Sequence, residues 1–193
     1  MIRIQQLYKS YGREVVFDNY NLNIEDNKIT CIMGPSGCGK STLLNILAGL
    51  IQYKGSVTGL PDRISYVFQQ HNLLPNKTLL DNVKFVAPDY TDAEALMELL
   101  GLREFMHKYP SQVSGGQRQR AAIARGIAYE PDLLLMDEPF SSVDHNLKLQ
   151  MLQDLRRIIK DKQITCIVVT HDKEDAEIFA DKIEVMEEGK GKK

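Results

Sequence analysis

Three short runs of aliphatic and β-branched residues divide the chain. They cover residues 28–33, 132–136 and 164–170. Each run is apolar along nearly its whole length, which is typical of a strand buried on both faces of a parallel sheet. Segments with helical spacing alternate with these runs, at residues 40–50, 92–100, 117–128 and 147–160. Strands that alternate with helices predict an α/β domain.

The first 27 residues show a different pattern. Short strands are predicted at residues 2–4, 15–17 and 22–24, with turns around Tyr11-Gly12 and at residues 25–27. We therefore expect a small antiparallel sheet before the core.

Between Gln69 and about Glu130 the β-type runs disappear. Pro75, Pro88 and Pro110 punctuate a helical pattern there, which predicts a helical insert. We accordingly expect one domain over residues 1–193. It would comprise an N-terminal β subdomain and phosphate-loop core (1–70), a helical subdomain (about 71–130) and a core continuation (131–193).

Composition is ordinary for a globular protein, with 43% apolar and 26% charged residues. The net charge of −2 provides no global positive field, so we expect no nucleic-acid partner and only local phosphate recognition. No apolar stretch approaches the roughly 20 residues of a membrane helix, and the N-terminus lacks the apolar core of a signal peptide. We expect a cytoplasmic chain in which Cys31, Cys38 and Cys166 stay reduced.

The strongest chemical pattern lies between the first apolar run and the first predicted helix. It matches G-x-x-x-x-G-K-[ST] and consists of Gly34, Pro35, Ser36, Gly37, Cys38, Gly39, Lys40 and Ser41. Its glycines let successive N–H groups converge at a helix N-terminus and form a nest for phosphate oxygens. Lys40 is expected to reach the β- and γ-phosphates, and Ser41 to offer its hydroxyl to Mg²⁺.

We add Thr42, which follows, to this predicted nucleotide site. The alternative is a glycine-rich turn that binds nothing. The complete motif between a strand and a helix favours nucleotide binding, although it does not choose among kinases, GTPases and ATPases.

Asp137 and Glu138 directly follow the second apolar run. Ligands of parallel sheets collect at the carboxyl ends of the strands, which is also where the phosphate loop begins. Neighbouring strand residues point in different directions, so Asp137 is expected to face Mg²⁺ and Glu138 the attacking water, as a general base. A helix cap or a surface acid pair is the alternative, and the phosphate loop favours the catalytic interpretation.

His171 occupies the same position after the third apolar run. There it is expected to bind the γ-phosphate or to orient the attacking water. A lone histidine is more often structural or simply exposed, and we interpret His71, His107 and His145 in that way.

The segment after Val113 carries a family resemblance. Ser114, Gly115, Gly116 and Gln117 resemble the LSGGQ signature of ABC-type ATPases, with Val113 in place of the usual leucine. They precede a predicted helix and so form a second anion site, with a helix cap and hinge as the alternative. The resemblance implies a head-to-tail dimer, either a homodimer or a pair with another ATPase subunit. In that dimer these residues of one copy close on ATP held by the other.

The resemblance implies roles for three further residues. Gln69 matches the Q-loop glutamine that senses Mg²⁺ or water and joins the core to the helical insert. Asp144 matches the D-loop acid that acts across the dimer. Tyr11 matches the aromatic residue that stacks on adenine, although an aromatic side chain in a turn more often simply packs.

The fold implied by this family is a P-loop NTPase (RecA-like) core with a parallel sheet, an N-terminal antiparallel β subdomain and an inserted α-helical subdomain. Each motif occurs once, unlike the paired cassettes of translation-associated ABC proteins. The motif style is similar to that of bacterial importer ATPases, in particular those of nitrate, sulfonate and taurine uptake. Because little sequence follows Gly189, we do not expect the regulatory domain of maltose-type importer ATPases.

The resemblance implies an ATP-hydrolysing subunit that lies peripherally on the inner face of the cell membrane. It would drive a separate permease and, through it, work with an extracytoplasmic substrate-binding protein. Two alternatives stay open. One is a non-transport ABC ATPase that acts as a regulatory or assembly module, and the other is a P-loop kinase with a small acceptor.

Overall fold

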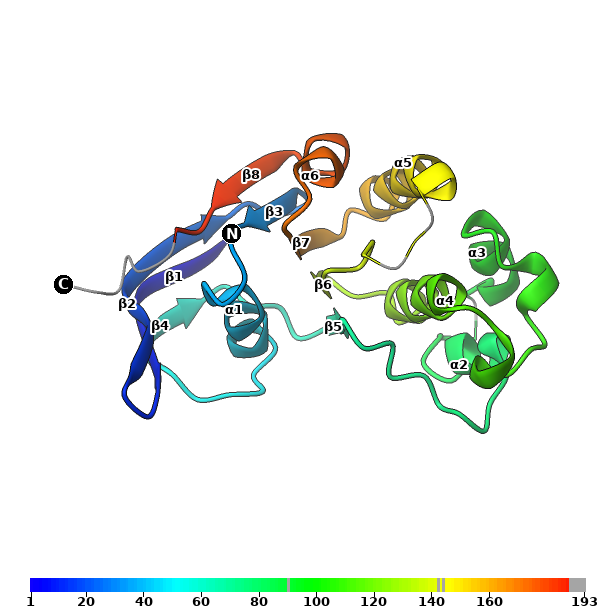
Figure 1. The fold of residues 1–193 in the computed structure, drawn as a ribbon, viewed down its shortest axis with the longest axis horizontal. Coiled ribbons are helices and arrows are strands. Elements are labelled where there is room, and N and C mark those ends of the chain that lie inside the picture. The colour runs from blue at the N-terminus through cyan, green and yellow to red at the C-terminus, as the bar shows by residue number, and fades with distance from the viewer. Residues whose placement is uncertain (90, 142, 144, 188–193) are drawn as a thin grey trace.

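The computed structural model describes residues 1–89, 91–141, 143 and 145–187 (Figure 1). The strands are β1 (Ile2–Tyr11), β2 (Glu14–Ile24), β3 (Ile29–Met33), β4 (Lys54–Thr58), β5 (Ile64–Val67), β6 (Leu133–Asp137), β7 (Thr165–Thr170) and β8 (Lys182–Val185). The helices are α1 (Lys40–Leu47), α2 (Leu79–Lys84), α3 (Ala93–Leu99), α4 (Gly115–Ala128), α5 (His145–Asp161) and α6 (Lys173–Phe179), with 3₁₀ turns at Arg103–Phe105 and Pro110–Gln112. Within these described ranges, no helix has the length and apolarity needed to cross a membrane.

The antiparallel sheet has the strand order β2-β1-β4. It confirms the predicted N-terminal sheet, but β2 is one continuous strand where the sequence predicts two. The pairing register between β1 and β2 shifts at three places between Ile4 and Ser10. Such irregularities interrupt the alternation of apolar and polar residues, which is why the continuity of the strand is not visible in the sequence.

The central sheet has the order β5-β6-β7-β3-β8, and all of its strand pairs are parallel. Its strands β3, β6 and β7 confirm the three predicted apolar runs. Along β6, Leu133 and Leu135 belong to one buried cluster and Leu134 and Met136 to another. Both faces of β6 are therefore covered, which explains its uninterrupted apolar sequence. Strands β5 and β8 have four residues each and were not predicted.

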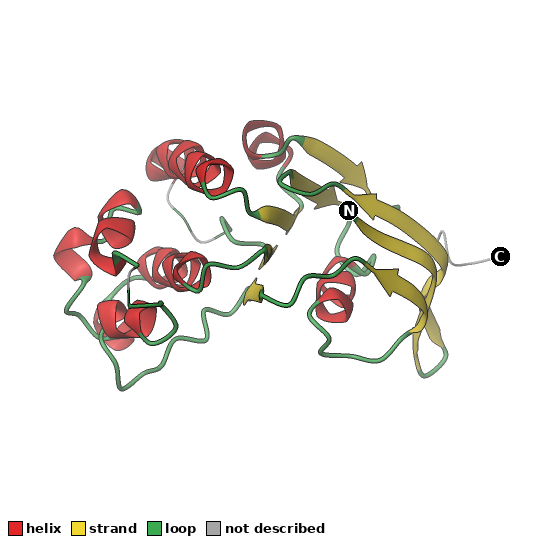
Figure 2. Cartoon of the chain, turned by 180° about the vertical axis from the view of Figure 1, so that it is seen from behind, coloured by secondary structure: helices red, strands yellow, loops and turns green. Residues whose placement is uncertain are grey.

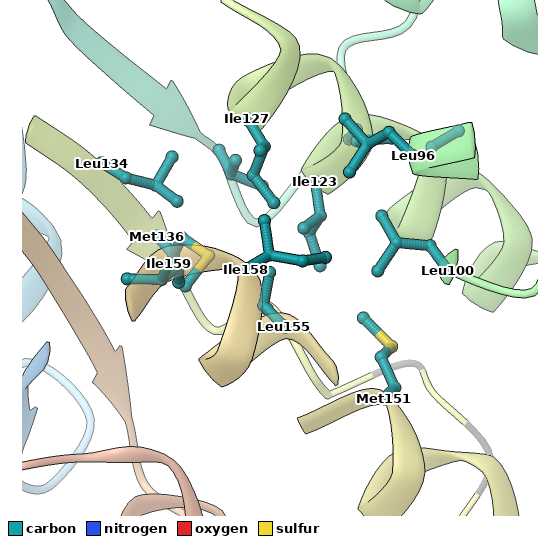
Figure 3. Close-up of a cluster of buried hydrophobic side chains, with 14 of the residues drawn as sticks. Leu96, Leu100, Ile123, Ile127, Leu134, Met136, Met151, Leu155, Ile158 and Ile159 are labelled. Carbon is teal, nitrogen blue, oxygen red and sulfur yellow. The ribbon is translucent and has the colours of Figure 1, made fainter. Parts of the chain in front are cut away.

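Two hydrophobic cores lie on the two faces of this sheet. On one face, Ile123 and Ile127 of α4 and Leu155 of α5 pack with Leu134 and Met136 of β6 (Figure 3). On the other face, α1 contributes buried leucines that pack with apolar residues of β1 and β2. The sheet thus fixes the ends of β3, β6 and β7 relative to one another.

The segment between β5 and β6 contains helices and no strand in its described residues. Helices α2, α3 and α4 gather at the end of the molecule opposite the antiparallel sheet (Figures 1 and 2). The side chain of Asn82, which is fully buried, accepts a hydrogen bond from the N–H of Leu74 (2.7 Å) and donates to the carbonyl of Thr78 (2.9 Å). It ties the loop after β5 to α2. The subdomain boundaries at residues 70 and 130 stay a prediction.

Candidate functional site

A cleft of about 400 Å³ opens at the carboxyl ends of β3 and β6, beside α1. It is lined by Tyr11, Glu14, Val16, Ser36, Gly37, Gly39, Lys40, Ser41, Thr42, Gln69, Asp137 and Glu138. The phosphate loop, the loop after β5 and the end of β6 therefore surround one cavity. These three segments are far apart in the sequence, and parallel strand pairing brings them together.

The phosphate loop joins β3 to α1 and has a backbone that needs glycine. Gly37 and Gly39 have φ angles of 84° and 106°, in the region that side chains disfavour. A Cβ atom on Gly39 would also lie 2.6 Å from Cγ1 of Val16. Among the described side chains none caps the N-terminus of α1, and its first turn holds no acidic residue. The first N–H groups of α1 are therefore available to an anion.

Lys40 is the first residue of α1 and is largely buried. Its Nζ donates hydrogen bonds to the carbonyl oxygens of Gly34 (2.7 Å) and Pro35 (2.9 Å). Because these carbonyl groups are neutral, they hold the ammonium in place without cancelling its positive charge. The charge therefore remains in the lining of the cleft. The position suits a phosphate group, which an ammonium binds as a point charge.

Asp137 ends β6 and is buried. Burial is the main cause that raises the pKa of its carboxyl group, and repulsion by Glu138 adds to the effect, while a hydrogen bond from Ser41 opposes it. The hydroxyl of Tyr66 also donates to Oδ2 of Asp137 over 3.4 Å. The site thus places the carboxylate and the Ser41 hydroxyl side by side, both of them hard oxygen ligands of the kind that Mg²⁺ prefers. Tyr66 was not predicted, since its role depends on the pairing of β5 with β6.

Glu138 and His171 meet at the edge of the cleft. Nδ1 of His171 lies 3.0 Å from each carboxylate oxygen of Glu138. The Glu138 side chain is 13% exposed, whereas that of His171 is 68% exposed. Glu138 has a φ of 48°, and its N–H donates to the carbonyl of Val169 over 3.0 Å. The turn after β6 is therefore tied to β7, which carries His171 at its end.

Tyr11 lines the same cleft, with half of its surface exposed and Nζ of Lys9 4.8 Å from the ring centroid. Glu14 lies opposite Tyr11 in the β1–β2 register and also lines the cleft. Sequence reasoning missed Glu14 and Val16, because only the hairpin register reveals them.

Cys38 lies in the phosphate loop but points away from the cleft. Its side chain faces a small cavity of about 50 Å³ behind the loop, which Tyr20 and Met186 also line. Cys31, Cys38 and Cys166 are free thiols, as the sequence predicts, and all three are buried. If Cys38 contacts a phosphate group, the contact is therefore made by its backbone N–H and not by its thiol.

The signature residues stand apart from this cleft. Ser114 caps α4, because the N–H of Gln117 donates to its Oγ (3.3 Å) and the N–H of Ser114 donates to Oε1 of Gln117 (2.8 Å). Helix α4 starts at Gly115, two residues earlier than predicted. Neither Gly115 nor Gly116 lines the cleft described above, and the same holds for Ser114 and Gln117. The predicted D-loop acid, Asp144, lies outside the described residues.

A phosphate loop after β3 and carboxylates at the end of β6, a second strand of the same parallel sheet, define a P-loop NTPase. A family model described as "ABC transporter" matches residues 17–141. The chain therefore belongs to the ABC transporter family, which confirms the resemblance of its motifs and the predicted fold class.

Two curated relatives are import proteins. The chain is 38% identical over 212 residues to the sulfate/thiosulfate import ATP-binding protein CysA 2 of Shewanella oneidensis, which covers 98% of this chain and 60% of the relative. It is 36% identical over 212 residues to the spermidine/putrescine import ATP-binding protein PotA of Haemophilus influenzae, covering 98% of this chain and 56% of the relative. The chain thus spans about 60% of the length of these relatives. The finer resemblance to nitrate, sulfonate and taurine importers stays a prediction.

Solved structures agree with this assignment. The dimeric structure of MJ0796, a bacterial ABC transporter cassette, superimposes with a TM-score of 0.86 at 33% identity, covering 98% of this chain and 95% of that one. A post-hydrolysis state of the same cassette, bound to ADP and Pi, gives a TM-score of 0.85.

Proposed function

We propose that this chain is the ATP-binding and ATP-hydrolysing subunit of an ABC importer. The observation that carries the proposal is the single cleft that gathers Lys40, Ser41, Gln69, Asp137 and Glu138. These residues supply a phosphate-binding cation, oxygen ligands for a metal ion and a carboxylate base. The relatives named as import ATP-binding proteins support the direction of transport.

ATP is proposed to lie in the cleft in one orientation. The first N–H groups of α1 and the ammonium of Lys40 would hold the phosphates, and Tyr11 would stack on the adenine at the other end. Ser41, Asp137 and Gln69 would hold Mg²⁺. Mg²⁺ commonly binds through one or two carboxylates together with substrate phosphates, and it neutralises phosphate charge when bound.

Glu138 is the proposed general base of the hydrolysis. A water molecule would attack the γ-phosphorus while the bond from that phosphorus to the ADP oxygen breaks, and Glu138 would accept the proton that the water loses. His171 would hold the Glu138 carboxylate from the side and bind the γ-phosphate. Its contact with Glu138 over 3.0 Å supports this role.

The catalytic unit is proposed to be a head-to-tail dimer with two composite sites. Ser114, Gly115, Gly116 and Gln117 stand away from the cleft of their own chain, at the exposed start of α4. In the dimer they would close on the γ-phosphate bound by the other copy, and Asp144 would act across the same interface. The dimeric relative MJ0796 supports this assembly.

The helical end of the molecule is the proposed link to a permease at the inner face of the membrane. A cavity of about 190 Å³ between β5 and α4 is lined by Tyr66, Val86, Arg125 and Tyr129, among others. Arg125 also donates to the carbonyls of His71 and Asn72 in the loop after Gln69. A permease segment in this cavity would thus act on both the Q-loop and the signature helix. An extracytoplasmic binding protein would deliver the substrate to that permease.

The deciding experiment is the Glu138→Gln variant. We expect it to bind ATP normally, to lose about 10²–10⁴-fold in kcat, and to elute as an ATP-bound dimer in size exclusion. Glu98→Gln, on the exposed surface of α3, serves as the matched control and should retain full turnover. Robust turnover by Glu138→Gln would refute the assignment of the base.

Two further outcomes would point elsewhere. ADP production that requires a small acceptor and occurs in the monomer would indicate a P-loop kinase. Purification from membranes in mild detergent without any membrane protein would contradict the permease partnership and favour a regulatory or assembly module.

A further inference from the structure

Lys148 joins two carboxylates at the start of α6. Its Nζ lies 3.1 Å from Oδ2 of Asp172 and 2.7 Å from Oδ1 of Asp175. The Lys148 side chain is 15% exposed, and that of Asp175 only 4%. Exposed ion pairs contribute little, but a buried charge without a partner is costly, so this cluster constrains the elements that carry it. Those elements are the first turn of α5 and the first turn of α6.

Asp172 is fixed from three directions. Its Oδ1 accepts hydrogen bonds from the N–H groups of Glu174 (2.9 Å) and Asp175 (3.2 Å) and so caps α6. Its Oδ2 accepts a hydrogen bond from Nζ of Lys148. Its own N–H donates to Oγ1 of Thr170 over 3.1 Å. His171 stands between Thr170 and Asp172 in the chain. Because its ring is largely exposed, the orientation of His171 depends on how firmly this turn is held.

We propose that Lys148 is a positioning residue that sets His171 against Glu138, an inference that rests on the proposed function. Three contacts carry this inference. Ser141, in the loop before α5, donates to the carbonyl of Glu138 over 3.0 Å. Lys148, in the first turn of α5, forms an ion pair with Asp172. His171, the residue before Asp172, contacts the Glu138 carboxylate. Lys148 thus connects the segment that follows the general base to the histidine that holds it.

The test compares Lys148→Met with Lys148→Arg. Methionine keeps the bulk of the stem and removes the charge, so the turn should loosen and kcat should fall about tenfold, in line with the sensitivity of catalysis to small displacements. The KM for ATP should stay unchanged, because Lys148 does not line the cleft. Lys148→Arg should restore most of the turnover.

Imidazole resonances in NMR spectra provide a readout that does not depend on turnover. The His171 signal can be assigned by its loss in His171→Gln. We expect it to shift in Lys148→Met and to return toward its native position in Lys148→Arg. A slower kcat without a shifted His171 signal would overturn the proposed route through the histidine.

Lys160→Met is the matched control, since Lys160 lies at the other end of α5 and pairs with Asp181. It should change neither kcat nor the His171 signal. Lys148→Met leaves Asp175 without its cation, so Lys148→Met/Asp175→Asn removes both charges and guards against a folding defect, which thermal unfolding checks. The kcat of this double variant should also be lower than that of the native protein.

Two results separate this inference from the proposed function. If kcat and the His171 signal are unchanged in both Lys148→Met variants, the inference is overturned. If Glu138→Gln is slow in the same experiments, the assignment of Glu138 as the base still holds. A shifted His171 signal in Lys148→Met supports the positioning role even if Glu138→Gln proves active.

Discussion

Nζ of Lys40 donates a hydrogen bond to the carbonyl oxygen of Gly34 over 2.7 Å. This bond links the first residue of α1 to the residue that follows β3, and it spans the whole phosphate loop. The loop is therefore shaped by its own lysine before a phosphate group enters. We expect ATP binding to shift the ammonium from these carbonyl oxygens to phosphate oxygens.

Lys40→Ala should bind ATP weakly and remain monomeric. A charge-assisted hydrogen bond contributes roughly 1.5–3 kcal/mol, so we expect the affinity to fall about 10- to 100-fold. Titration with a fluorescent ATP analogue measures this, with Lys28→Ala on the exposed surface as the control. Equal dissociation constants for Lys40→Ala and the native protein would contradict the assigned role.

Ser114→Ala should separate a structural from a functional role of the signature. Loss of the cap costs about 1 kcal/mol of stability, and loss of the proposed contact across the dimer should reduce kcat much more strongly. Thr78→Ala is the matched control, since Thr78 caps α2 through the N–H of Asp81 (3.1 Å) and lies outside the cleft lining. If both variants lose the same modest stability and keep turnover, Ser114 is only a cap.

The features that the sequence predicted are those that local chemistry determines. The first four residues of β6 are apolar because both faces of the strand are buried, and the glycines of the phosphate loop are required by its backbone. Neither property depends on which strands become neighbours. Both were therefore visible in a single sequence.

The features that were missed depend on contacts between distant segments. Tyr66 reaches Asp137 only because β5 pairs with β6, and Glu14 reaches the cleft only through its register with Tyr11. Glu138 and His171 were each predicted at a strand end. Their direct contact required β6 and β7 to be adjacent, and strand order cannot be obtained from periodicity.

Alkylation of Cys38 should inhibit ATP hydrolysis, and ATP should protect against it. Its thiol lies behind the phosphate loop, so an adduct would push the loop into the cleft. Cys31 and Cys166 should react far more slowly, because both are fully buried and burial raises the pKa of the Cys31 thiol to about 12 and also raises that of Cys166.

Mass spectrometry after N-ethylmaleimide treatment identifies the modified residue, and Cys38→Ala supplies the resistant control. Equal labelling rates with and without ATP would show that nucleotide does not close the loop over this thiol.

Asp181 should make the stability of the fold depend on acid pH. Burial alone would raise the pKa of its carboxyl group, but the N–H of Ile29 (2.8 Å) together with Lys160 and Arg156 lowers the pKa below its ordinary value. Its stabilising contribution is therefore complete above the ordinary carboxyl pKa of about 3.9. It is lost as the pH falls through the lower pKa of the folded state.

Urea unfolding from neutral pH to about pH 3 tests this dependence. The difference in free energy of unfolding between the native protein and Asp181→Asn should shrink toward the acid end. Asp161→Asn, at the exposed end of α5, should follow the native curve. A difference that stays constant across this range would show that the charge of Asp181 is not what stabilises the fold.

Because the backbone of Glu138 is left-handed, stability and activity favour different residues at this position. A side chain at its φ of 48° costs about 1 kcal/mol relative to a relaxed conformation, and glycine would tolerate that angle without strain. A screen that selects only for thermal stability would therefore favour the substitution Glu138→Gly. That substitution would remove the carboxylate on which the proposed reaction depends, so the fold retains a less favourable residue where the chemistry requires it.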